Sequence, residues 1–335
     1  MTFLRRVALN GIVSAYRRTS GRLSLQLDHV GLVTRDLVVL RQHWQRLGFA
    51  PTDIHELFRM DSESGERIAL GQRSCHAVFA GSYIELSEVT SVDPSHHLAS
   101  WLERGPGLDI LALSSEALEQ THQQLAGAQI PLTPLAEATR FIDYGHLSGD
   151  AHFRWCMLQP SVSPEGLVCL MAHLSAERVF QSEVQQHDNG AVALEGIFIS
   201  VPSAESKSTV ERYRQLLGGE PSPIELGGVC FNLETGFIAV VPESEESTAA
   251  GLTLARLSGL AHFSTLVVGV KDIQQTRAVL DRNAVPFQVA SPLAHAYWQS
   301  ALASDPKRDT PQLASLQISE SEVGGTSLMF RPARV

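Results

Sequence analysis

The chain has 335 residues, which is long for one compact domain, so two domains are the natural expectation. Apolar residues make up 44% and charged residues 19%, as in ordinary globular proteins, and the net charge of −10 argues against nucleic acid or an anionic membrane as the main partner. The four cysteines are far apart, and no apolar run reaches the roughly 20 residues that span a bilayer. We therefore expect a cytoplasmic protein without a disulfide framework or a membrane span.

Residues 1–22 form a basic N-terminal extension. Five arginines flank a weakly apolar stretch, and the segment contains no acidic residue. It fits either a helix appended to the body of the protein or, in a eukaryote, a transit peptide. A secretory signal fits poorly, because Asn10 and Gly11 interrupt the apolar stretch.

One pattern then recurs four times: a short apolar strand, a polar turn, an amphipathic helix, a Gly or Pro break and further strands. The first strands of the four repeats begin near Leu27, Leu108, Leu194 and Phe263. The helices that follow them are expected at residues 36–47, 115–125, 204–217 and 272–280. The pattern predicts an α+β fold of four βαβββ modules.

The helices and closing hairpins carry their own signals. In the first helix, Leu37, Leu40, Trp44 and Leu47 recur at spacings of three and four and form one apolar stripe. The side chains placed to cap helices are those of Asp36, Ser115 and Asp272. The closing strands are expected at residues 75–80 and 82–88, 153–158 and 167–174, 229–233 and 237–241, and 313–318 and 326–330. Pairing of neighbouring modules predicts two domains, at residues 23–176 and 190–335.

Four segments, LDHVGLV at residues 27–33, YIEL at residues 83–86, residues 154–173 and HDNGA at residues 187–191, together resemble the vicinal-oxygen-chelate superfamily. This superfamily contains glyoxalase-like proteins, bleomycin-resistance proteins and extradiol dioxygenases. The resemblance covers about residues 25–332. It implies that two modules pair into a cupped, partly open barrel, and that the first and last strands of each module carry the ligands of a divalent metal.

On this resemblance, the metal ligands are His29 and Glu85 from the first module, with Asp109 and His173 from the second. Side chains alternate along a strand, so His29 and Glu85 can both face the concave side of the sheet. A His and a carboxylate there suit Zn, Fe, Mn, Ni or Co. Many family members carry His in place of Asp109, which also fits a turn. Either three ligands hold the ion with Asp109 optional, or no ion is bound; in both cases His29, Glu85 and His173 are predicted to converge in one cavity.

The segment between residues 139 and 155 is the candidate for substrate contacts. Arg140, Tyr144 and Arg154 could hold a substrate carboxylate or an enolate oxygen. A solvated polar loop explains these residues equally well. His96 and His97 are predicted to lie in a surface turn. His76 lies in a predicted strand and could point inward or outward, so we assign it no function.

The second half offers no comparable ligands. Gly196 and Thr265 take the place of His29, while Ala239 (or Val240) and Met329 take the place of Glu85. We therefore expect the second half to keep the fold without the site, and any metal to be held by the first half.

The resemblance implies a metal-dependent enzyme that acts on a small molecule with two neighbouring oxygens, as an isomerase, a lyase or a ring-cleaving enzyme. One alternative is an Fe(II) extradiol-type dioxygenase, although the commonest of those enzymes use their second pair of modules. Another is a metal-free protein that sequesters a small ligand in the cup. The expected partner is a small molecule rather than nucleic acid, and a homodimer is compatible with the sequence.

Overall fold

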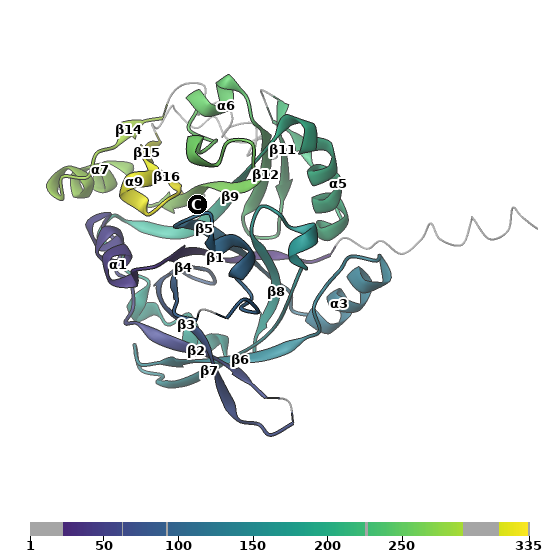
Figure 1. Ribbon diagram of the computed structural model, residues 1–335. Coiled ribbons are helices and arrows are strands. Elements are labelled where there is room, and N and C mark those ends of the chain that lie inside the picture. Colours follow the sequence, from purple (N-terminus) through teal and green to yellow (C-terminus); the bar gives the residue numbers. More distant parts are fainter. Residues whose placement is uncertain (1–22, 62, 92, 225–226, 291–314, 334–335) are drawn as a thin grey trace, which may run out of the picture.

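The computed structural model describes residues 23–61, 63–91, 93–224, 227–290 and 315–333 (Figure 1). The basic extension at residues 1–22 and the start of the strand predicted at residues 313–318 lie outside the described residues. The described strands form two eight-stranded sheets, one from each half of the chain. None of the described helices is long and apolar enough to cross a membrane.

The first two modules form a closed barrel with the strand order β1-β4-β3-β2-β6-β7-β8-β5. Its strands are β1 (Gln26–Thr34), β2 (His55–Met60), β3 (Arg67–Val78), β4 (Tyr83–Val89), β5 (Gly107–Ser114), β6 (Ala136–Ile142), β7 (Gly149–Met157) and β8 (Leu167–His173). The helices of this half are α1 (Leu37–Arg46), α2 (Ala99–Leu102) and α3 (Leu118–Gly127). The barrel is closed rather than partly open, because β2 pairs with β6.

The last two modules form an eight-stranded sheet with the order β10-β11-β12-β9-β13-β16-β15-β14. Its strands are β9 (Ala191–Val201), β10 (Ser222–Pro223), β11 (Val229–Asn232), β12 (Phe237–Pro242), β13 (His262–Val270), β14 (Gln288–Val289), β15 (Leu316–Ile318) and β16 (Ser327–Pro332). The helices that follow β8 are α4 (Ala176–Val179), α5 (Ser206–Leu217), α6 (Glu245–Ala249), α7 (Ile273–Arg282) and α9 (Glu320–Val323). The predicted fold of four βαβββ modules is confirmed.

The helix starts agree with two of the three predicted caps. Asp36 accepts a hydrogen bond from Val39 N at 3.0 Å, and Asp272 accepts one from Gln274 N at 2.8 Å. The prediction for Ser115 was wrong, since α3 begins only at Leu118. The Ser115 hydroxyl bonds to the Thr121 hydroxyl and accepts from Ala117 N, so it stabilises the turn before α3 and not the first turn of the helix.

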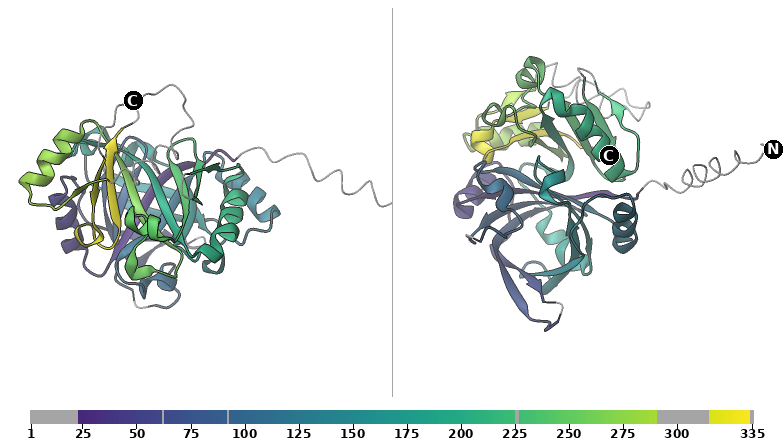
Figure 2. Two further views of the ribbon diagram at one scale, coloured as in Figure 1. Left: turned by 90° about the horizontal axis from the view of Figure 1, so that it is seen from above. Right: turned by 45° about the vertical axis from the view of Figure 1, so that its right-hand side comes forward.

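The two halves lie side by side (Figure 2). One hydrophobic core crosses from the barrel to the second sheet. Trp44 of α1 is fully buried and donates from Nε1 to the carbonyl of Val323 in the second half. The rings of Phe49 and Phe330 stack across the same boundary at 5.8 Å. Each half therefore covers apolar surface of the other. The division into two domains, at residues 23–176 and 190–335, stays a prediction.

A buried carboxylate also joins the halves. Glu165, in the connection between β7 and β8, has a fully buried side chain. Its carboxylate accepts hydrogen bonds from the Tyr213 hydroxyl at 2.7 Å and from Arg212 Nη2 at 2.6 Å, both on α5. A buried charge is tolerated only when it is paired in this way, so this contact fixes how α5 sits on the barrel.

Candidate functional site

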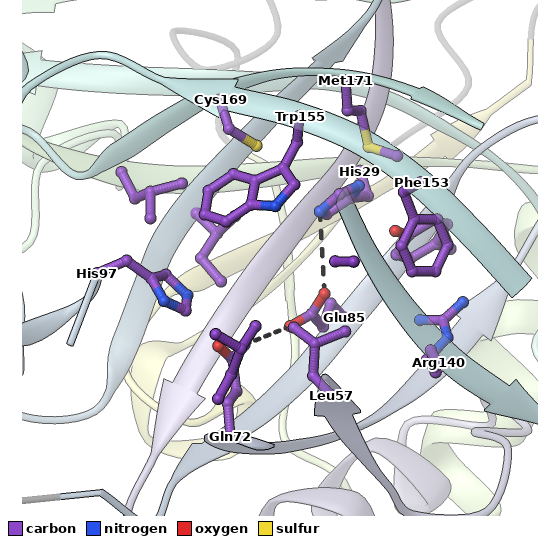
Figure 3. A pocket seen from close by; sticks show the side chains of 15 residues that line it. His29, Leu57, Gln72, Glu85, His97, Arg140, Phe153, Trp155, Cys169 and Met171 are labelled. Carbon is purple, nitrogen blue, oxygen red and sulfur yellow. Dashed lines mark hydrogen bonds and ion pairs between the residues drawn. The ribbon is translucent and has the colours of Figure 1, made fainter. Parts of the chain in front are cut away.

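The barrel encloses a cavity with a volume of about 80 Å³ (Figure 3). One water needs roughly 10–15 Å³ on this scale, so a small organic molecule can enter. The wall is mostly apolar, with side chains that include Ile110, Phe153, Trp155, Cys169 and Met171. The lining residues with polar side chains include His29, Gln72, Tyr83, Glu85, His97 and Arg140. A largely apolar cavity with a few converging polar groups is typical of a small-molecule site.

A β-bulge positions His29. Leu27 and His29 pair with consecutive residues of β5, so Asp28 is an extra residue in β1. A bulge of this kind turns neighbouring side chains toward each other. The Asp28 carboxylate consequently lies 2.8 Å from His29 Nδ1, and both side chains are buried.

Asp28 also contacts His173, at the end of β8. His173 Nε2 lies 3.1 Å from Asp28 Oδ2. Burial by itself raises the pKa of Asp28, but the charges and hydrogen bonds of His173 and His29 outweigh it and hold that pKa well below its usual value. Asp28 is therefore a carboxylate, so His29 donates to it from Nδ1 and leaves Nε2 as the ring atom that faces the cavity.

Glu85 of β4 lies on the other side of His29 Nε2. The distance from that nitrogen to Glu85 Oε2 is 3.8 Å. Gln72 Nε2 donates to Glu85 Oε1 at 3.0 Å, and the Ser87 hydroxyl also bonds to this oxygen. Glu85 is thus held in the cavity wall with one oxygen directed at His29.

Arg140 of β6 is buried beside them. Its guanidinium lies over the Tyr83 ring at 5.3 Å and the Phe153 ring at 5.6 Å. Its Nη1 atom contacts His76 Nε2. Burial, with a smaller contribution from Arg140, holds the pKa of His76 well below its usual value, so the neutral imidazole accepts this hydrogen bond.

The other two predicted substrate contacts lie away from the cavity. Tyr144 donates to the carbonyl of Val179 at 3.0 Å, and its pKa is raised by burial, with Arg140 opposing. Arg154 faces outward because its neighbours in β7 face the cavity, and it pairs with Glu119 and Glu137 on the surface. Of the three residues, the structure places Arg140 in the cavity.

Only two of the four predicted metal ligands line the cavity. His29 and Glu85 do so, whereas His173 is directed at Asp28, and Asp109 is not among the residues that line the cavity. The second bulge of the barrel explains the placement of Asp109. It falls at Asp109 in β5, which makes Asp109 the counterpart of Asp28 and not of His29.

The registers identify the true counterparts. Gly31 pairs with Glu85 in the first module, and Ala112 pairs with Cys169 in the second. Ile110 is therefore the counterpart of His29, and Cys169 that of Glu85. The alignment of Asp109 with His29 was wrong by one residue, and such a slip exchanges the two faces of a strand.

Two polar residues of the cavity were not predicted. His97 was placed in a surface turn, but it lines the cavity and packs against Trp155 with ring centroids 5.6 Å apart. Burial lowers its pKa to about 3, so it is neutral. Gln72 shares the buried face of β3 with Ser74 and His76, and that alternation in the sequence was its available signal.

The donor set falls short of a tight metal site. Among the described residues, no group of three or more His, Cys, Asp or Glu side chains is arranged to hold an ion. His29 and Glu85 supply two donors, and His76 Nε2, which lies 3.9 Å from Glu85 Oε2, is already bonded to Arg140. Catalytic zinc sites have three protein ligands, and a buried guanidinium in the same cavity opposes a second cation. The residues present therefore do not fit the implied metal.

The second sheet carries no His, Asp or Glu at the corresponding places. His29 lies two residues before Gly31, the residue that pairs with Glu85. In the same way, Gly196 lies two residues before Phe198, which pairs with Ala239, and Thr265 lies two residues before Val267, which pairs with Met329. The Phe237 ring covers Gly196, where a Cβ would lie 2.4 Å from it. Buried apolar side chains, including Phe198, Phe237, Leu252 and Met329, fill this side of the sheet. The predicted loss of ligands at these positions agrees with the register.

The βαβββ modules are paired, and the first pair surrounds a cavity. His29 from the first strand and Glu85 from the last strand of the first module line that cavity. These features define a vicinal-oxygen-chelate scaffold. The sequence model of the glyoxalase-like domain family matches residues 27–217, more than half of the chain, and the chain belongs to that family. A comparison with curated proteins found no match.

The solved structures that share the fold include the following three. A hypothetical protein from Staphylococcus aureus has a TM-score of 0.57 and 9% identity, covering 92% of this chain and 100% of that chain. A mutant of 4-hydroxymandelate synthase from Streptomyces coelicolor has a TM-score of 0.52 and 16% identity, covering 94% and 95%. A xylose isomerase-like TIM barrel/4-hydroxyphenylpyruvate dioxygenase fusion protein has a TM-score of 0.52 and 12% identity, covering 92% and 50%. At these identities the likeness shows the fold alone.

Proposed function

We propose that the protein is an enzyme that removes a proton from a carbon atom next to a carbonyl or carboxylate group of a small molecule bound in the barrel. His29 is the general base. The observation that carries this proposal is the geometry of its ring, with Nδ1 bonded to the buried Asp28 carboxylate and Nε2 facing the cavity. This arrangement fixes the tautomer and stabilises the imidazolium that forms when Nε2 accepts a proton.

The other polar groups have complementary tasks. The electron pair of the broken C–H bond moves onto the neighbouring oxygen, and the positive charge of Arg140 stabilises the resulting enolate. Glu85, 3.8 Å from His29 Nε2, is the second group that can hold a proton near the same carbon. Return of the proton to another atom or face gives isomerisation or epimerisation, and loss of a leaving group gives a lyase.

The competing proposal is a protein that only binds and sequesters a small ligand. It would use the same apolar cavity but would have no need for the contact between Asp28 and His29. Exchange of substrate hydrogen for solvent deuterium separates the two, because it follows enolate formation and requires no knowledge of the final product.

The test is proton NMR in D₂O with a panel of small 2-oxo acids and 2-substituted carboxylic acids. We expect the protein to exchange the hydrogen next to the carbonyl of at least one compound, and His29→Gln to abolish the exchange. Asp28→Asn should slow it by about 10²- to 10⁴-fold, because the ring then loses its fixed tautomer.

His146→Gln is the control, since His146 is exposed and pairs with Glu183 away from the cavity. Exchange that persists in His29→Gln would remove His29 as the base. If the wild type exchanges no compound that it binds, the sequestering function is favoured.

A further inference from the structure

Arg140 is a buried cation without a matching anion. Among the described residues, no carboxylate forms an ion pair with it within 4.0 Å, and its residue is 3% exposed. Glu85, in the same cavity, is bonded to Gln72 and Ser87 and directed at His29 instead. An unpaired charge in an apolar environment is costly, and proteins keep such an arrangement where a ligand completes it.

Two particular atoms of the guanidinium are free. Nη1 donates to the neutral imidazole of His76, whereas the buried Nε and Nη2 atoms have no hydrogen-bond partner in the part of the chain that the structure describes. The Tyr144 hydroxyl donates to the carbonyl of Val179; burial raises the pKa of Tyr144, while the charge of Arg140 and a weak hydrogen bond from its guanidinium lower it. The N–H groups of Nε and Nη2 point from the same edge of the planar guanidinium. That edge matches the two oxygens of a carboxylate.

The surroundings limit what can bind there. The guanidinium borders on Tyr83 and Phe153, and the cavity continues along Trp155, Cys169 and Met171. Arg140 is the one Arg or Lys in the cavity wall as described, and Glu85 would repel a second negative charge. The chemistry favours one carboxylate attached to a compact apolar or aromatic group.

We propose that Arg140 binds the carboxylate of the substrate side-on through Nε and Nη2, and that the substrates are small apolar or aromatic monocarboxylates. The proposal rests on the function proposed above, because it names the substrate class of that same cavity. Arg140, His29 and Glu85 line the same cavity, so the carboxylate-binding group and the proposed base would act on one bound molecule.

The probes are benzoate and benzamide, which have nearly the same shape and differ in charge. Isothermal titration calorimetry should show that the full-length protein binds benzoate about ten- to a hundredfold more tightly than benzamide. Arg140→Gln should reduce this preference to near unity. Arg140→Lys keeps the charge but cannot form the bidentate hydrogen bonds, so it should retain only part of the preference for benzoate. Arg154→Gln, an outward-facing arginine of the adjacent strand, should leave it unchanged.

Thermal unfolding checks that Arg140→Gln is still folded. We expect Arg140→Gln to unfold at the same temperature as the wild type or higher, since it removes an unpaired buried charge. Benzoate should raise the unfolding temperature of the wild type and not that of Arg140→Gln.

Equal affinity for both probes, no binding of benzoate at millimolar concentration, or an unchanged preference in a folded Arg140→Gln protein would overturn the proposal. The two proposals fail separately. Carboxylate binding without deuterium exchange in any bound acid would reject the enzyme and keep the Arg140 site. Exchange in neutral carbonyl compounds that is indifferent to Arg140→Gln would keep the enzyme and reject the substrate class.

Discussion

Replacement of Asp109 by asparagine should make the protein more stable at neutral pH. Asp109 is almost completely buried at the start of β5, at the joint between the two halves. Burial raises its pKa from the ordinary 3.8 to about 7, although the charges of Arg104 and Arg256 oppose the rise. Asparagine has nearly the same shape and no charge, so it isolates the cost of ionising this carboxyl.

The sign follows from proton binding. Between about pH 4 and pH 7 the folded protein holds one proton on Asp109 that the unfolded chain has released, so stability falls as the pH rises. A rise from 3.8 to about 7 is about 3 pH units. At 1.36 kcal/mol per unit it amounts to about 4 kcal/mol, an upper bound because water and local relaxation reduce it. Below pH 4 both states are protonated and the effect vanishes.

The assay is urea unfolding of the wild type and Asp109→Asn at pH 4, 6 and 8, compared by midpoint at an unchanged slope. The difference in unfolding free energy should be small at pH 4 and should favour the variant by about 2–4 kcal/mol at pH 8. Asp188→Asn, an exposed carboxyl, is the control. If Asp109→Asn is less stable than the wild type at pH 8, the carboxylate is ionised and stabilised by Arg104 and Arg256, and the reasoning is wrong.

Two further predictions concern the joint between the halves and the metal. Glu165→Gln should lower the unfolding free energy by about 1–3 kcal/mol, because Arg212 loses the charge of its buried partner. Glu211→Gln, on the exposed face of α5, is the control and should cause no measurable change. Equal effects of the two variants would contradict the buried contact. Protein purified without chelators should contain well below one equivalent of metal, and EDTA should leave its unfolding temperature unchanged, since no three His, Cys, Asp or Glu side chains of the described residues are arranged to hold an ion. One equivalent that survives dialysis and is lost in Glu85→Gln would show that a third ligand exists.

The sequence determined the modules because their signals are local. The stripe of Leu37, Leu40 and Trp44 follows from helical spacing, and these three residues are the buried ones of α1. Asp36 and Asp272 cap the helices that directly follow them. The prediction that Gly196 and Thr265 stand where His29 stands in the first module agrees with the strand registers.

Only the tertiary structure decided which side chains meet in the cavity. One extra residue in β1 turns Asp28 to His29, and another in β5 turns Asp109 away so that Ile110 faces the cavity instead. A bulge depends on the pairing of two strands far apart in the sequence, so neither strand specifies it alone. The same holds for Arg140. The sequence specifies an arginine at this position. The way β3, β6 and β7 pack around the guanidinium decides that its Nε and Nη2 atoms have no hydrogen-bond partner among the described residues.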